Sequence, residues 1–323
     1  MARWLFYLIV LVLTTGVASA EPAILRVGLL KFGTVAWEID TITYHRLDTK
    51  HDIRVVPIEF ATNDAAKIAL QADAVDLIVT DWPWVVRQRA EGARFSFTPY
   101  SRAVGALLVA PGSGIHRLAD LKGKRVGVVG GPLDKSWLLL RALSKRDIGA
   151  DLADVAEPVF GAPPLLSEEF SAGRVEAVLT YWHYAARLEA AGATPLLSVA
   201  DMVERLGGSA DVPMLGYAFD EAWAAQHREA IENFLEASRE AKTVLASSEN
   251  EWERLTPLLG TSDAKVRTAL KIGYRAGILD HWRDEERHAA ARLYDVLVEL
   301  GGERLVGRAR SLDFATFWRS REE

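Results

Sequence analysis

The segment GGPLDKSW, which begins at Gly130, brings together residue types that suit an anion site ahead of a leucine-rich stretch with helical spacing. Gly130 and Gly131 let a backbone approach a ligand closely, and Asp134 and Ser136 are residue types that begin helices. Because free N–H groups and the helix dipole attract negative charge, this turn predicts a site for a carboxylate, sulfonate or phosphate. Lys135 would add a positive charge there.

Motifs for catalysis, metals and nucleotides do not fit this chain. The glycine segment lacks the Gly-Lys-Ser/Thr end of a Walker loop and the G-x-G-x-x-G spacing of a dinucleotide site. The seven histidines have no zinc-type spacing, and there is no calcium loop or G-x-S-x-G elbow. With no cysteine, a thiol nucleophile is excluded as well. We expect a non-enzyme with no catalytic residues, no metal and no cofactor.

Strand-like and helix-like patterns alternate along most of the chain. Strand patterns in the first part, each followed by a helical pattern, lie at 24–30, 53–60 and 76–80. A longer apolar strand is expected at 102–115, and a second alternating set then begins with 118–129 and continues through 177–182 and 194–199. Residues 221–300 are nearly all helical in pattern. This order predicts two α/β units, each with a mostly parallel sheet flanked by helices, and a helical C-terminal tail.

The first 20 residues have the layout of an export signal. One positive charge at Arg3 precedes an apolar run that ends in the small residues Ala18, Ser19 and Ala20. We expect cleavage after Ala20, which changes the net charge from −6 to −7 and argues against nucleic-acid binding. A lipid tether would need a cysteine, so a soluble periplasmic protein without membrane insertion is expected.

Two segments carry a family resemblance. LADLKGKRVGV at 118–128 resembles the second-lobe signature of bacterial periplasmic solute receptors, which have a two-lobed type II periplasmic binding protein fold. The opening VGLLKFGTVAWEIDTITYHRLD, with GRVEAVLTYWHYAARLEAAGA, resembles the nitrate/taurine/sulfonate receptors of ABC importers, a group that includes thiamine-precursor receptors. The resemblance implies a monomer that closes like a hinge on a small-molecule ligand and docks on an ABC permease with its ATPase.

The same resemblance implies how the chain divides and where a ligand would lie. It implies a signal at 1–20, lobe one from 24–104 and 213–323, and lobe two from 105–212. Four strand-end turns would then meet in the cleft between the lobes. Candidate ligand-binding residues in these turns, with Arg102 beside the crossing strand, are Phe32, Gly33, Thr34, Trp37, Thr80, Asp81, Trp82, Gly130, Gly131, Asp134, Lys135, Ser136, Trp137, Tyr181, Trp182 and His183.

Tryptophan is concentrated in these turns. Five of the ten tryptophans lie there: Trp37, Trp82, Trp84, Trp137 and Trp182. Flat rings suit a planar ligand, although each could equally be a core residue. Together with an anion site and one amine, they favour an aromatic quinone with several carboxylates. We take pyrroloquinoline quinone as the leading ligand hypothesis, bound as cargo, because parts of the turns resemble a receptor subgroup linked to quinoprotein alcohol oxidation.

Lys135 could contribute more than charge. A lysine amine desolvated among aromatic rings can lose its proton and add to a carbonyl. Arg102 and His183 are further candidates for pairing with a carboxylate.

Other functions stay open at this point. The alternative cargo is a sulfonate, nitrate or a thiamine-type pyrimidine. A small lyase or dehydratase on the same fold and a periplasmic accessory of a dehydrogenase are the competitors from other classes.

Overall fold

The computed structural model describes residues 21–279 and 281–319. The predicted export signal at 1–20 lies outside these residues. Within the described part, no helix is both long enough and apolar enough to cross a bilayer.

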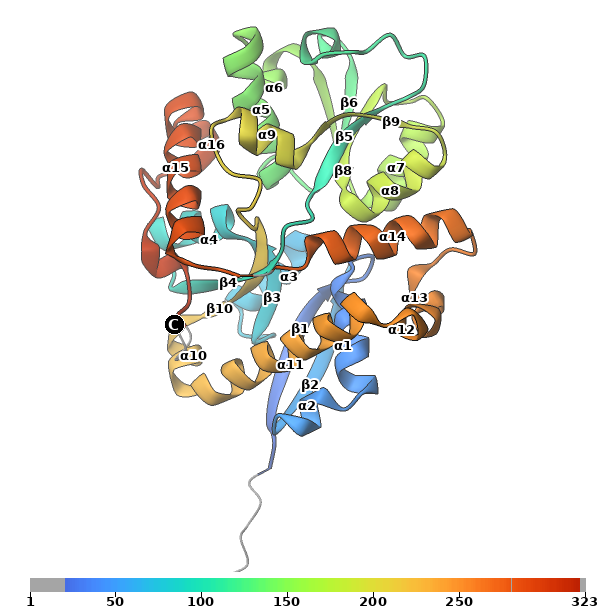
Figure 1. The fold of residues 1–323 in the computed structure, drawn as a ribbon. Coiled ribbons are helices and arrows are strands. Elements are labelled where there is room, and N and C mark those ends of the chain that lie inside the picture. Colours follow the sequence, from blue (N-terminus) through green and yellow to red (C-terminus); the bar gives the residue numbers. More distant parts are fainter. Residues whose placement is uncertain (1–20, 280, 320–323) are drawn as a thin grey trace, which may run out of the picture.

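Two five-stranded mixed sheets form the centres of two lobes, one above the other in Figure 1. The first sheet has the order β2-β1-β3-β10-β4, in which β1 is parallel to β2 and β3, and β10 is antiparallel to β3 and β4. Its strands are β1 (Ala23–Leu30), β2 (Ile53–Phe60), β3 (Leu77–Asp81), β4 (Phe95–Ser101) and β10 (Leu215–Asp220).

The second sheet repeats this arrangement with the order β7-β6-β8-β5-β9. Here β6 is parallel to β7 and β8, and β5 is antiparallel to β8 and β9. Its strands are β5 (Gly105–Val109), β6 (Arg125–Val129), β7 (Glu157–Gly161), β8 (Ala177–Tyr181) and β9 (Thr194–Ser198). In both sheets the strand order reverses beside the first parallel strand, which is where ligands bind in open α/β sheets.

Helices flank both sheets. Those between the strands of the first lobe are α1 (Val35–Tyr44), α2 (Leu47–Lys50), α3 (Asn63–Gln71) and α4 (Trp82–Ala90). Those of the second lobe are η1 (Leu118–Leu121), α5 (Lys135–Ile148), α6 (Leu152–Val155), α7 (Pro163–Ser171), α8 (Trp182–Ala190) and α9 (Val199–Arg205). The C-terminal set is α10 (Glu221–Gln226), α11 (Arg228–Ser247), α12 (Glu249–Arg254), α13 (Thr256–Leu259), α14 (Ala264–Gly277), α15 (Asp284–Gly301), α16 (Glu303–Val306) and η2 (Phe314–Thr316).

The C-terminal helices pack against both lobes. Helix α14 runs between the two sheets and lies against α8, while α15 lies against α5 (Figure 1). Leu293 and Tyr294 of α15 are buried in one continuous core that contains Trp82 of the first lobe and Leu138 of the second. The lobes are therefore joined by two chain crossings, β4–β5 and α9–β10, and also by the packing of these helices against both of them.

Several elements differ from those expected from the sequence. The long strand expected at 102–115 is only the five residues Gly105–Val109, because the backbone turns at Pro111 and Gly112 (φ +72°). Strands β4, β7 and β10 were not predicted. β10 is nonetheless central in its sheet, since it pairs with both β3 and β4.

Candidate functional site

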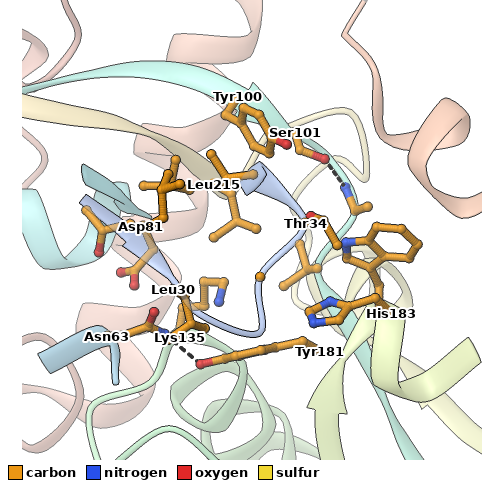
Figure 2. A pocket seen from close by; sticks show the side chains of 18 of the residues that line it. Leu30, Thr34, Asn63, Asp81, Tyr100, Ser101, Lys135, Tyr181, His183 and Leu215 are labelled. Carbon is orange, nitrogen blue, oxygen red and sulfur yellow. Dashed lines mark hydrogen bonds between the residues drawn. The ribbon is translucent and has the colours of Figure 1, made fainter. Parts of the chain in front are cut away.

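A cavity lies between the two sheets, at the carboxyl ends of β1 and β3 on one side and of β8 on the other (Figure 2). The cavity volume, taken as the space that the centre of a water molecule can occupy, is about 80 Å³. Its polar and aromatic lining residues come from both lobes: Thr34, Asn63, Thr80, Asp81, Tyr100, Ser101, Lys135, Tyr181, Trp182 and His183. A small polar molecule in this cavity can therefore contact both lobes.

Five helices begin at or beside this cavity, namely α1, α3, α4, α5 and α8. Three have a side chain that accepts a hydrogen bond from their first turn: Thr62 for α3, Asp81 for α4 and Asp134 for α5. The first turns of α1 and α8 receive no such cap. Trp182 N of α8 donates to the Val104 carbonyl oxygen, and Trp37 N of α1 donates to that of Thr34. The positive ends of both helix dipoles nevertheless lie at the cavity and favour an anion there.

Lys135 is the one basic side chain among the described lining residues. It is only 3% exposed, and its Nζ lies 3.8 Å from Asp134 Oδ2 and 5.3 Å from the centre of the Tyr181 ring. The lysine is the first residue of α5, so the Asp134 cap fixes its position at the helix start. A buried ammonium with ring contact can bind an anion more strongly than a solvated one.

Two hydrogen bonds cross between the lobes at the cavity. Asn63 Nδ2 donates to Tyr181 Oη at 2.7 Å, and His183 Nε2 lies 2.8 Å from the carbonyl oxygen of Phe32. Since a carbonyl only accepts, we assign the hydrogen of His183 to Nε2. These bonds hold the lobes in a closed arrangement around the cavity.

His183 is neutral in this environment. Burial of the ring lowers its pKa to about 4, against the opposing effect of the Phe32 carbonyl. With the hydrogen on Nε2, the neutral ring leaves Nδ1 as a bare acceptor, and this buried atom has no hydrogen-bond partner. His183 therefore does not supply the positive charge that would pair with a carboxylate.

This lowered pKa predicts a pH-dependent stability. Below the ordinary histidine pKa near 6.5, the unfolded chain takes up a proton that the folded chain binds only near pH 4, so the folded state loses stability as the pH falls. We expect this residue to lower the free energy of unfolding by about 2 kcal/mol between about pH 7 and pH 5. Urea denaturation of the protein at the two pH values measures the loss.

The matched variants are His183→Gln, whose amide can still donate to Phe32, and His116→Gln at an exposed position. The first should remove the loss between the two pH values and the second should keep it, because the remaining histidines are common to all three proteins. An unchanged pH dependence in His183→Gln would refute a buried neutral ring.

The two cavity tyrosines stay protonated. Burial raises the pKa of Tyr100 and of Tyr181 well above the usual value, so both hydroxyls remain possible donors at neutral pH. The Tyr100 hydroxyl is itself covered, and Thr34 and Tyr274 are its polar neighbours.

A buried cluster of polar side chains around the carboxylate of Glu38 lies next to Tyr100. Lys242 Nζ is 4.5 Å from the centre of the Tyr100 ring and 3.3 Å from Glu38 Oε2. Glu38 has no exposed surface, and its carboxylate accepts hydrogen bonds at 2.5–3.0 Å from Tyr217, Ser238 and Tyr274. This cluster connects β10, α11 and α14 to α1 and so fixes the wall of the cavity.

About half of the residues predicted from the sequence lie in the cavity lining: Gly33, Thr34, Thr80, Asp81, Lys135, Tyr181, Trp182 and His183. Two more predicted residues contact the lining: the Phe32 carbonyl oxygen is hydrogen-bonded to His183, and Asp134 pairs with Lys135. Residues that the sequence did not suggest for the site include Asn63, Tyr100 and Ser101. Asn63 is the first residue of α3, and the other two end the strand β4 that was not predicted.

Four of the five turn tryptophans lie outside the lining. Trp82 packs against Tyr294 and Phe317, and Trp84 stacks on Phe95. Trp37 and Trp137 are also buried, the first among Trp182, Trp252 and Tyr274, the second against Phe160. Each sits in a helix whose apolar face turns toward a core, so the expectation of a cavity walled by these four rings is corrected.

The remaining predicted residues are outside the lining as well. Gly130, Gly131 and Ser136 shape the start of α5: Gly130 has φ +94°, the Gly131 carbonyl accepts from Asp134 N, and Ser136 N donates to the Asp134 cap. Arg102 Nη2 donates to the Ile278 carbonyl oxygen at 3.0 Å, and Nη1 lies 3.6 Å from Asp211. Arg102 thus connects the two crossing segments to the end of α14.

Within residues 21–279 and 281–319, one group of side chains has the residue types and spacing of a metal site. Ligand atoms of His51, Glu236 and Glu240 lie within 4.8 Å of one another. Lys50 Nζ, however, is 2.7 Å from both oxygens of Glu240. Because this ammonium already neutralises the carboxylate, we assign no metal site here.

Comparison with known proteins gives a family and a fold. A sequence profile of the family described as NMT1/THI5 like matches residues 49–249. No curated protein matches the sequence significantly.

Solved structures match over most of the chain. The alkanesulfonate-binding protein SsuA from Xanthomonas axonopodis pv. citri, bound to MOPS, has a TM-score of 0.69 at 19% identity, over 89% of this chain and 97% of its own. The periplasmic aliphatic sulphonate binding protein SsuA from Escherichia coli has a TM-score of 0.68 at 22% identity, over 90% and 92%. The ligand binding component of an ABC-type import system from Staphylococcus aureus, with zinc bound, has a TM-score of 0.70 at 12% identity, over 92% and 96%.

These likenesses confirm the two-lobed periplasmic binding protein fold that was predicted from the sequence. By their names, all three are binding proteins or binding components.

Proposed function

The chain belongs to the NMT1/THI5-like family, and from that premise we propose that it is a periplasmic solute receptor which closes around a small anion and delivers it to an ABC permease. The observation that carries the proposal is the cavity between the lobes. It joins one buried lysine and two helix starts without a side-chain cap in one space between the lobes. This combination favours a negatively charged guest.

The charges of the lining support a small, singly charged ligand. Lys135 is accompanied by the carboxylate of Asp81, so a quinone with several carboxylates would bring more negative charge than one lysine can balance. Of the turn tryptophans, only Trp182 lines the cavity, which removes most of the stacking surface expected for a large planar ligand. A small sulfonate or carboxylate fits better, in keeping with the sulfonate-binding neighbours.

A ligand panel tests the proposal. The purified mature protein is titrated with ethanesulfonate, 2-aminoethanesulfonate, propanoate, 3-aminopropanoate, nitrate, pyrroloquinoline quinone and a thiamine-type pyrimidine. Calorimetry and the fluorescence of Trp182, which lies in the cavity wall, report binding. We expect at least one small sulfonate or carboxylate to bind with micromolar affinity or better and to be recovered unchanged.

The panel also separates the competing functions. Tight binding of the quinone alone would replace the proposed ligand class with the quinone. Conversion of a bound compound to a product would favour a lyase or dehydratase. Absence of binding by every anion in the panel would overturn the receptor proposal.

A further inference from the structure

Asp81 places a negative charge in a cavity that is otherwise built for an anion. Its side chain is 5% exposed, and one oxygen, Oδ1, accepts a hydrogen bond from Trp84 N at 2.9 Å. Among the described residues, no lysine or arginine lies within ion-pair distance of Asp81, whereas Lys135 is paired with Asp134. A buried carboxylate without a cationic partner is costly unless a donor reaches it.

The carboxylate of Asp81 lines the same space as Lys135 (Figure 2). The cap of α4 uses only Oδ1, which leaves Oδ2 as a further acceptor. A ligand that is only an anion could not satisfy this acceptor, because it brings no hydrogen to donate.

We infer that Asp81 selects a ligand that carries a hydrogen-bond-donating nitrogen as well as an anionic group. The anionic end is placed by Lys135 and the starts of α1 and α8. The nitrogen end, an amine or an N–H of a ring, donates to Asp81. This inference rests on the proposed receptor function and narrows the ligand class to small amphoteric acids.

Matched probe pairs test this selection on the unmodified protein. Ethanesulfonate and 2-aminoethanesulfonate differ only by the amine, as do propanoate and 3-aminopropanoate. We expect the amine-bearing member of a pair that binds to do so about tenfold more tightly, since a hydrogen bond to a buried charged group is a strong one. Calorimetric Kd values provide the ratio.

Two variants test whether Asp81 causes this ratio of Kd values. Asp81→Asn keeps an oxygen for Trp84 N but loses the charge, and the ratio should fall toward one. Asp220→Asn is the matched control, because Asp220 caps α10 in the same way and lies outside the cavity lining. It should leave the ratio as in the wild type. Thermal unfolding checks that both variants are folded.

Each result bears on one of the two claims. Equal affinity within a pair that binds, or a ratio that Asp81→Asn leaves intact, would overturn the selection by Asp81 while the receptor function stands. Failure of all four probes to bind would overturn the proposed small-anion ligand and this inference with it.

Discussion

Replacing Lys135 with methionine will weaken binding of the tightest sulfonate or carboxylate probe by about 10–100-fold. A hydrogen bond to a charged group contributes about 1.5–3 kcal/mol, and about 1.4 kcal/mol corresponds to a factor of ten in Kd. Lys135 is 3% exposed and is the one basic side chain in the described lining, so no described neighbour in the wall can replace its charge. Methionine has a similar length and keeps the packing against Tyr181. Calorimetric titration measures the loss.

Lys122→Met is the control for this change. Lys122 is exposed in the same lobe and does not line the cavity, so its loss should leave the Kd within about twofold. Binding by Lys135→Met that is as tight as in the wild type would show that the helix starts alone hold the anion. In that case the assignment of Lys135 to the ligand would be wrong.

Replacing Glu38 with leucine will lower the free energy of unfolding by about 3–5 kcal/mol, because removal of one partner leaves a buried charge uncompensated. Glu38 has no exposed surface and accepts hydrogen bonds from three hydroxyl groups, while Lys242 lies 3.3 Å away with its side chain 15% exposed. In the variant the ammonium and the hydroxyls lose their acceptor together. Equilibrium denaturation with urea gives the change.

The double variant Glu38→Leu with Lys242→Met identifies the origin of this loss. Replacing both members of a buried ion pair with apolar residues typically costs less than removing one of them. The double variant should therefore be more stable than the sum of the two single changes predicts. Strict additivity would contradict the assignment of the loss to an unpaired Lys242, and would leave only the packing of leucine among the hydroxyls as its cause.

Local patterns were sufficient to predict much of this fold. The alternation of apolar runs with helical spacing predicted two α/β units, and the prediction of a two-lobed fold was confirmed. Helix starts at Asp81 and Asp134 were also predictable, because proline and capping side chains act within a few residues. The place of Lys135 at the site was predictable for the same reason, since it is the first residue after such a cap.

Strand β10 and the end of β4 were not predictable in this way. The sequences LGYAFD and FSFTPYS are short and weakly patterned, and they become strands because each pairs with the other and β10 also pairs with β3. Tyr100 and Ser101 enter the cavity only through that pairing. A residue whose place depends on a distant strand leaves no local signal.

The sequence by itself determined which turns bear helix starts, tryptophans and charges; the tertiary structure decided which of those side chains face the cavity. Trp82 follows Asp81 directly, yet the carboxylate lines the cavity while the indole packs on Tyr294 and Phe317. Likewise His183 meets Phe32 only because the lobes bring residues far apart in the chain together. Side-chain direction at a helix start depends on which core the helix packs against, and that choice is made by contacts distant in sequence.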